Sequence, residues 1–125
     1  MTELRFRQPI FIDDKFRYWH YWGFIDGASI GPDTGTHTIK QAHETSQQFT
    51  GLKDKNGKEV WEGDILTFLS TPTHYNLTYE VIFIDGCFRL NGIGSTVGSQ
   101  SAWRIDKAKI IGNIYENPEL VKEKP

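Results

Sequence analysis

Polar turn residues and glycines divide this chain into short segments that have the apolar pattern of β-strands. The clearest case lies within 48–66, QFTGLKDKNGKEVWEGDIL. Asn56-Gly57 stands between charged residues there, and an Asn-Gly pair favours the positive φ angles of a type I′ hairpin turn. We therefore expect 49–53 and 58–61 to pair as antiparallel strands around this turn.

The second half of the chain continues in the same way. Glu62-Gly63-Asp64 interrupts the pattern, and strands and hairpin turns are expected after it. The expected elements, in order, are a buried strand at 65–69, a loop at 71–73, a strand at 79–84, a hairpin turn at Asp85-Gly86, a returning strand at 87–90 and a mobile surface loop at 92–101.

The last segment predicts one more strand and then a single helical turn. The range 109–115, KIIGNIY, is apolar enough for a strand, and Gly112 within it indicates a bulge or a close backbone approach. Asn117-Pro118-Glu119 offers a helix N-cap followed by proline at the first helical position. No window has the 3.6-residue period of a long helix.

The N-terminal third is rich in aromatic residues. Leu4 and Phe6 alternate with charged neighbours, which predicts a strand over 3–7 that Pro9 limits. Asp13-Asp14 is a turn signal. The range 15–26, KFRYWHYWGFID, has rings on both faces and predicts a strand covered on both sides.

The middle of the chain has weaker patterns. Turn clusters occur at Asp26-Gly27 and at 31–35, beside short strand candidates around Ile30 and at 37–39. The range 40–48 is mostly polar and has no apolar pattern, so we interpret it as a connection. Any division of the chain is expected there.

These patterns predict an all-β protein with 125 residues in a single domain. With 8 Phe, 5 Tyr and 4 Trp, most rings are expected to fill the core. The net charge of -2 supplies no global field for a polyanion. Cys87, as the single cysteine, excludes an intrachain disulfide and is expected to be a buried strand residue.

Localisation is expected to be cytoplasmic, in a bacterial host cell. No apolar run approaches the ~20 residues of a membrane helix. The N-terminal residues MTELRFRQP lack the apolar region of a secretion signal. No membrane partner is expected.

Candidate catalytic chemistry is sparse. The histidines lie in separate segments without zinc-ligand spacing: His20, His37, His43 and His74. Glu62 and Asp64 are close in sequence, but Asp64 beside Gly63 is expected to cap turn amides. No nucleophile elbow, phosphate loop or HExxH motif occurs. We therefore expect no enzyme activity and assign no catalytic, cofactor or metal residues.

Two blocks carry a resemblance to a known family: QFTGLKDKNGKEVWEGDIL at 48–66 and IIGNIYENPEL at 110–120, supported by LRFR at 4–7 and VIFIDGCF at 81–88. The chain resembles the YopX family, small proteins encoded by phages and prophages of mainly Gram-positive bacteria. The resemblance implies a small SH3-like β-barrel. From the strand patterns and the polar connection, the single domain is expected to comprise an N-terminal β part at about 1–47, a hairpin-rich barrel part at about 48–116 and a C-terminal tail at 117–125. The resemblance implies no assigned activity.

Two functions remain open. The favoured one is a non-catalytic interaction module that uses a strand edge or an aromatic patch to bind a phage or host protein, or another copy of itself. The alternative is a small barrel that binds single-stranded nucleic acid, since cations and rings interleave over 5–24 and rings can stack on bases. Its candidate residues are Arg5, Arg7, Arg17, Trp19 and Tyr21.

Overall fold

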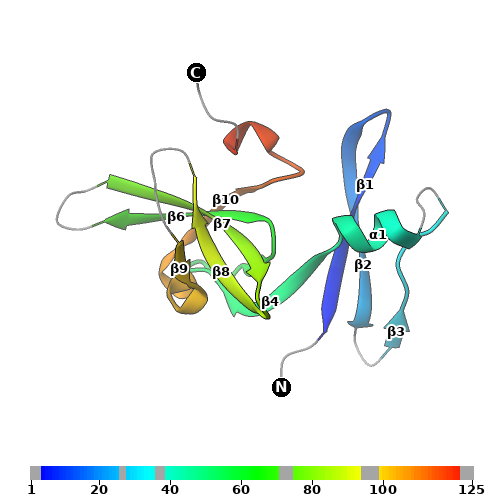
Figure 1. Ribbon diagram of the computed structural model, residues 1–125, viewed down its shortest axis with the longest axis horizontal. Coiled ribbons are helices and arrows are strands. Elements are labelled where there is room, and N and C mark those ends of the chain that lie inside the picture. The colour runs from blue at the N-terminus through cyan, green and yellow to red at the C-terminus, as the bar shows by residue number, and fades with distance from the viewer. Residues whose placement is uncertain (1–3, 26–27, 36–38, 71–74, 94–98, 122–125) are drawn as a thin grey trace. The chain divides into compact units, whose positions relative to one another are not determined.

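The computed structural model describes residues 4–25, 28–35, 39–70, 75–93 and 99–121 (Figure 1). The chain divides into two compact units, Met1–Gly51 and Leu52–Pro125. The single-domain prediction remains a prediction.

The first unit is a twisted antiparallel sheet with one short helix (Figure 1). Its elements are β1 (Arg5–Ile12), β2 (Lys15–Ile25), β3 (Ala28–Ile30), α1 (Ile39–Thr45) and the beginning of β4 (Gln47–Lys53). The strand order is β3-β2-β1-β4. Strand β4 continues across the unit boundary, where it lies next to β5 in the same sheet. The turn signal at Asp13-Asp14 is confirmed, since φ is 54° and 62° at the two residues.

Three expectations for the N-terminal third are wrong. Strand β1 does not end near Pro9 but continues to Ile12, with Pro9 opposite Trp19. Proline has no N–H, so a ladder tolerates it only where that N–H is not needed. Part of the expected connection at 40–48 is helix α1. Strand β2 is not covered on both sides, because Tyr18 and Phe24 are 52% and 58% exposed.

The weaker patterns have mixed outcomes. The strand candidate at Ile30 is confirmed as β3. The turn at Asp26-Gly27 and most of the candidate at 37–39 lie outside the described residues, and Ile39 begins α1.

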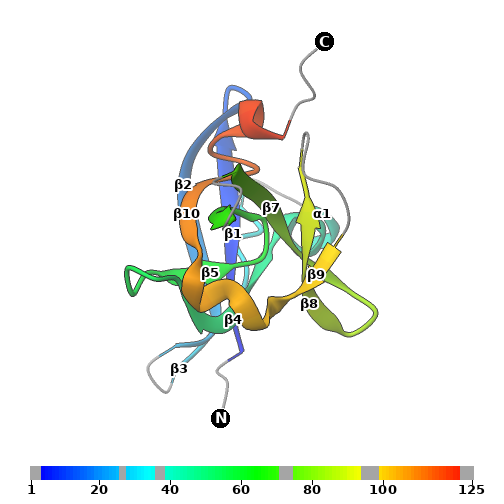
Figure 2. The ribbon, with the colours of Figure 1, turned by 90° about the vertical axis from the view of Figure 1, so that its left-hand side faces the viewer.

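The second unit is a five-stranded antiparallel sheet with a hairpin and two 3₁₀ turns. Its elements are β5 (Glu59–Trp61), β6 (Asp64–Ser70), β7 (Tyr75–Ile84), β8 (Cys87–Gly92), β9 (Ser99–Ser101), η1 (Ala102–Lys107), β10 (Lys109–Asn113) and η2 (Pro118–Leu120). The strand order is β10-β6-β7-β8-β9. In Figure 2, η1 leads from β9 at one edge back to β10 at the other.

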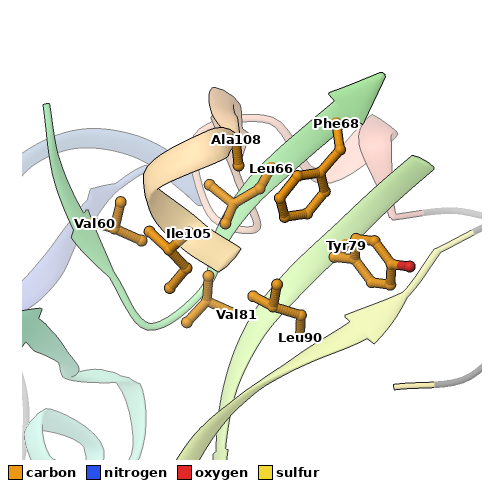
Figure 3. Packing of buried hydrophobic residues seen from close by; sticks show 8 residues of the cluster. All are labelled: Val60, Leu66, Phe68, Tyr79, Val81, Leu90, Ile105 and Ala108. Atoms are coloured by element: carbon orange, nitrogen blue, oxygen red, sulfur yellow. The ribbon is translucent and has the colours of Figure 1, made fainter. Parts of the chain in front are cut away.

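The core of this unit lies on one face of the sheet (Figure 3). Leu66 is opposite Tyr79, and Val81 is opposite Leu90, so these side chains share a face. Ile105 of η1 covers them (Figure 3). The remaining buried members of the cluster are Val60, Phe68 and Ala108.

The β4–β5 hairpin has a different turn from the expected type I′. Gly57 has φ of 80°, but Asn56 is not among the residues with positive φ. The N–H of Gly57 donates to the carbonyl of Asp54 at 3.0 Å, and the N–H of Asp54 donates to the carbonyl of Lys58 at 2.9 Å. The loop is therefore the three-residue kind, with a left-handed glycine at its end.

The second hairpin is confirmed in detail. Asp85 and Gly86 both have positive φ, 52° and 80°, and they join Ile84 to Cys87. The expected loop at 92–101 is wrong at both ends, because β8 extends to Gly92 and β9 begins at Ser99. Cys87 is exposed, against expectation.

The C-terminal segment follows the sequence closely. The register of β10 with β6 shifts between Ile110 and Gly112, which confirms the bulge. The helical turn is confirmed as η2, but Asn117 makes no side-chain cap. Its Oδ1 instead accepts from the N–H of Asn113 at 3.2 Å.

The fold is all-β, as predicted, apart from the seven-residue α1 and the 3₁₀ turns. The described strands form two open antiparallel sheets without a closed barrel. The core also departs from the expectation that most rings are buried. Among the described side chains, the buried rings are Phe49, Trp61, Phe68 and Tyr79.

Candidate interaction surface

The β1–β2 hairpin places most of the predicted binding residues on one face of its sheet. Arg7 lies opposite Tyr21, and Arg5 lies opposite Gly23. Trp19 is two residues from Tyr21 and therefore shares its face, as Arg5 shares the face of Arg7. We call this the arginine face.

Arg17 is set apart from these residues. The register passes from Ile10 opposite Tyr18 to Phe11 opposite Phe16, so Arg17 is the extra residue of a β-bulge. Its side chain is exposed, near the Asp13-Asp14 turn. The sequence could not reveal this, because the bulge depends on how the two strands pair.

The cations of the arginine face are packed against rings. The Arg7 guanidinium carbon lies 4.1 Å from the centroid of the Trp19 ring, and its Nε donates to Oε1 of Gln47 at 3.0 Å. Arg7 is only 7% exposed. The Arg5 guanidinium carbon lies 4.1 Å from the centroid of Phe49. Both cations stabilise the sheet through cation–π contacts.

The opposite face of this sheet is covered by the segment that follows β3. Gln8 is fully buried and forms two hydrogen bonds with the backbone of Asp33: Nε2 donates to its carbonyl at 3.0 Å, and Oε1 accepts from its N–H at 2.8 Å. Nε1 of Trp22 donates to Oγ of Ser46 at 2.9 Å. These contacts hold the chain between β3 and β4 against the hairpin.

The edge of the first sheet that β3 forms has exposed apolar side chains. Strand β3 pairs only with β2 in the described sheet, and all three of its residues are exposed. Exposed apolar side chains flank this edge on both faces: Ile30 lies opposite Gly23 on the arginine face, and Phe24 lies beside Leu4 on the other. We call this the β3 edge.

The two aspartates of the family block at 48–66 have structural roles. Oδ2 of Asp64 accepts from the N–H of Trp61 at 2.8 Å, and Oδ1 accepts from Nδ2 of Asn113 at 3.0 Å. This confirms Asp64 as a turn cap. The sequence interpretation missed Asn113, whose Oδ1 also accepts from the N–H of Tyr115 at 2.9 Å.

Asp54 accepts hydrogen bonds from three backbone N–H groups, and the sequence interpretation missed this role. Oδ1 accepts from the N–H groups of Asn56 and Lys58, both at 2.9 Å, and Oδ2 accepts from the N–H of Ile110 at 3.1 Å. Burial alone would raise its pKa, but these hydrogen bonds and the Lys58 charge hold the pKa below 3.8. An Asp just before a Lys-Asn-Gly turn was the available signal.

Two carboxylates, Glu62 and Glu80, and the phenol of Tyr115 interact electrostatically in the second unit. Burial raises the pKa of Glu80, and the charge of Glu62 raises it further. Burial and these two carboxylates also raise the pKa of the Tyr115 phenol. Within the described part of the chain, no group of three or more His, Cys, Asp or Glu is placed to hold a metal ion.

Two open sheets with side-chain-capped turns and an exposed apolar strand edge define a small all-β protein. The chain belongs to the YopX family, described as YopX protein, which matches residues 24–122. The resemblance noted in the sequence is thereby confirmed.

A solved structure is also similar. The match to protein EF1440 from Enterococcus faecalis covers 98% of this chain and 100% of that chain, with 28% sequence identity and a TM-score of 0.51. No curated protein matches the chain significantly. Among the described helices, none has the length and apolar character needed to cross a membrane.

Proposed function

We propose that this protein is a non-catalytic interaction module that binds a partner protein by accepting one of its strands at the β3 edge. The observation that carries the proposal is the exposed edge strand β3, with apolar Ile30 on one face of the edge and Phe24 of the adjoining β2 on the other. An added strand gains main-chain hydrogen bonds from such an edge, and its alternating side chains contact the two faces.

The hydrogen-bond directions of β3 agree with this mode of binding. The N–H of Phe24 donates to the carbonyl of Leu4 at 2.9 Å, so Phe24 directs its polar backbone groups toward β1. Ser29 is opposite Phe24, and it therefore directs its own N–H and carbonyl away from β2. A partner strand would meet these groups.

The test is recovery of a partner from host cells with and without phage infection, after nuclease treatment. We expect one stoichiometric protein, and its loss with Phe24→Glu/Ile30→Glu. Phe83→Glu/Ile84→Glu is the matched control, because these side chains are also exposed but belong to the second unit. Recovery of no protein by any form of the chain would overturn the proposal.

Ser29→Pro separates strand addition from simple apolar contact. Proline removes the outward N–H of the edge but leaves Phe24 and Ile30 in place. We expect binding to be lost in this variant while the melting temperature stays close to that of the wild type. Unchanged binding would exclude strand addition.

The proposal includes the absence of catalysis. Asp54 and Asp64, the two aspartates of the family block, accept hydrogen bonds from backbone and amide donors and serve the fold. We expect no turnover of nucleotides, phosphodiesters or peptides by the purified protein. Turnover that a single polar substitution abolishes would refute this part.

The phage or prophage origin and the cytoplasmic location belong to the same proposal. A phage accessory protein acts on phage or host proteins inside the infected cell, which is where a strand-accepting module would meet its partner. Detection of the chain in the cytoplasmic fraction of host cells, with a tag that leaves β3 exposed, would test the location.

Single-stranded nucleic-acid binding is the second candidate. One observation favours it: Arg5, Arg7, Trp19 and Tyr21 share a face, as cations and rings do in such sites. Against it, Arg7 is buried between Trp19 and Gln47. Binding of oligothymidylate that weakens steeply with salt and is lost in Trp19→Ala/Arg17→Ala would establish it. Salt-independent binding, or none at micromolar protein, would discard it.

A further inference from the structure

The turn between β1 and β2 forms a tip in which apolar residues lie beside both signs of charge. All six side chains of this hairpin tip are exposed: Ile12, Asp13, Asp14, Lys15, Arg17 and Tyr18. The tip lies at the opposite end of β2 from the β3 edge (Figure 1).

The two apolar side chains of the tip share one face of the hairpin. Tyr18 lies opposite Ile10, and Ile12 is two residues from Ile10 on the same strand. Ile10 is fully buried, whereas Ile12 is 49% exposed and Tyr18 is 52% exposed. The apolar stripe of this face thus continues past its covered part to the end of the hairpin.

The charged residues of the tip are separated by sign along the chain. Asp13 and Asp14 occupy the turn, and Lys15 and Arg17 follow it. Within the described part of the chain, the structure gives none of these four side chains an ion pair. The bulge at Arg17 takes its side chain out of the regular alternation of β2.

The turn has aspartate at its second position, where glycine would be favoured. Asp13 and Asp14 both have the left-handed conformation, φ 54° and 62°, which glycine adopts without strain. The other two-residue hairpin turn has Gly86 at its second position. The tip therefore keeps two carboxylates at a conformational cost.

We propose that the hairpin tip is an interface between two copies of this chain. A surface with two adjacent negative and two adjacent positive residues is complementary to itself under a two-fold rotation. The Asp13-Asp14 turn of one copy then faces Lys15 and Arg17 of the other. Ile12 and Tyr18 of both copies pack between the charges.

This association is independent of the proposed partner strand at the β3 edge. Because the tip is small, the dimer is weak and concentration-dependent. Its ion pairs lie at the rim of the interface, so added salt weakens it further.

Sedimentation velocity over a concentration series tests the proposal through charge variants. Asp13→Asn/Asp14→Asn leaves only positive charge at the tip, and asparagine still tolerates the left-handed conformation. Lys15→Glu/Arg17→Glu leaves only negative charge. We expect each variant to be monomeric alone, and an equimolar mixture of the two to form the heterodimer.

The matched control for Lys15→Glu/Arg17→Glu is Lys53→Glu/Lys55→Glu. It makes the same change in net charge, but at exposed residues of the second unit. We expect this control to dimerise like the wild type, and all variants to keep the wild-type melting temperature. A wild type that stays monomeric at the highest concentrations, or charge variants that dimerise unchanged, would overturn the proposal. If Phe24→Glu/Ile30→Glu abolishes recovery of a partner protein, we still expect that variant to dimerise like the wild type, and loss of its dimer would overturn the proposal.

Discussion

The carboxylate of Asp54 in the first hairpin accepts a hydrogen bond from the backbone N–H of Ile110, a residue 56 positions later in the chain. The Oδ2 to N distance is 3.1 Å. The adjacent Lys55 N–H donates to the carbonyl of Ala108 at 2.9 Å. One turn thus satisfies its own amides and also holds the start of β10.

Removing the Asp54 carboxylate should destabilise the second unit. Asp54→Ala leaves partly buried N–H groups without acceptors, and each such loss costs about 1 to 3 kcal/mol. Asp54→Asn retains one carbonyl oxygen, so we expect an intermediate effect. Urea unfolding of both variants, followed by circular dichroism, measures the order. Equal stability of wild type and Asp54→Ala would contradict this role.

The same residue predicts a pH dependence. The folded state lowers the pKa of Asp54 below 3.8, so the charged form stabilises the fold. This stability is present above the unfolded-state pKa and is lost as the pH falls through the folded-state pKa. Urea midpoints measured down to about pH 2 should therefore fall less steeply in Asp54→Asn than in the wild type.

Glu80 should have the opposite dependence. Burial and the charge of Glu62 raise the pKa of Glu80 above 4.5. The contribution of Glu80 to the stability of the fold is therefore lost as the pH rises through its folded-state pKa. Glu62→Gln removes the repulsion and should raise the urea midpoint at neutral pH, but not below about pH 4. Asp106→Asn, at an exposed site, is the charge control. A gain that is the same at both pH values would count against this explanation.

Gly57→Val should destabilise the hairpin by at least about 1 kcal/mol. The cost is conformational, because φ is +80° and a Cβ atom there would meet nothing within 4 Å. Gly57→Asn should cost less, since asparagine tolerates positive φ better than a β-branched residue does. Thermal melts of the two variants provide the comparison, and equal losses would point to a cause other than φ.

Gly112→Ala should act by steric contact. A Cβ atom there would lie 2.7 Å from Oδ1 of Asn117 and 2.7 Å from Cδ1 of Leu120. Both atoms are ends of side chains that can move, so the main cost is the hydrogen bond from the N–H of Asn113 to Oδ1 of Asn117, about 1 kcal/mol. We expect faster hydrogen exchange at the N–H groups of Asn113 and Asn117. Gly31→Ala, where the added atom meets nothing within 4 Å, should leave exchange unchanged.

Trp61→Ala should cost about 3 to 5 kcal/mol. Trp61 is only 4% exposed, so the substitution removes a buried ring. Trp61→Phe should retain most of the packing and cost less. Urea unfolding measures both, and a loss below about 1 kcal/mol for Trp61→Ala would mean that the cavity collapses.

Elements governed by adjacent residues could be predicted. The turns at Asp13-Asp14 and Asp85-Gly86 and the cap of the Trp61 N–H by Asp64 each depend on residues within a few positions of one another. The bulge was indicated by Gly112, although it forms only when β10 pairs with β6. The β4–β5 turn was harder. The Asp54 side chain bonds to the N–H groups of Asn56 and Lys58, and the loop takes the three-residue form instead of the type I′ turn that Asn-Gly favours.

The candidate surface was only partly accessible to sequence reasoning. Arg5, Arg7, Trp19 and Tyr21 do lie on one face, but this depends on the register of β1 with β2, and Arg7 is buried and Arg17 belongs to a bulge. A strand at Ile30 was predicted, but its place at the edge of the sheet was not, because strand order depends on the pairing of remote segments. Helix α1 was also missed, because seven residues have too little periodicity to distinguish them from a polar connection.

The sequence alone determined the all-β class, most of the hairpins and the family, because alternation and turn chemistry act over a few residues. Only the tertiary structure decided which rings are buried, which strand lies at an edge and which carboxylates accept hydrogen bonds from amides far away in the sequence. These outcomes depend on strand pairing between remote segments and on long-range contacts such as the hydrogen bond from the N–H of Ile110 to Asp54. Their register follows from the packing of the whole sheet, which no local window of sequence contains.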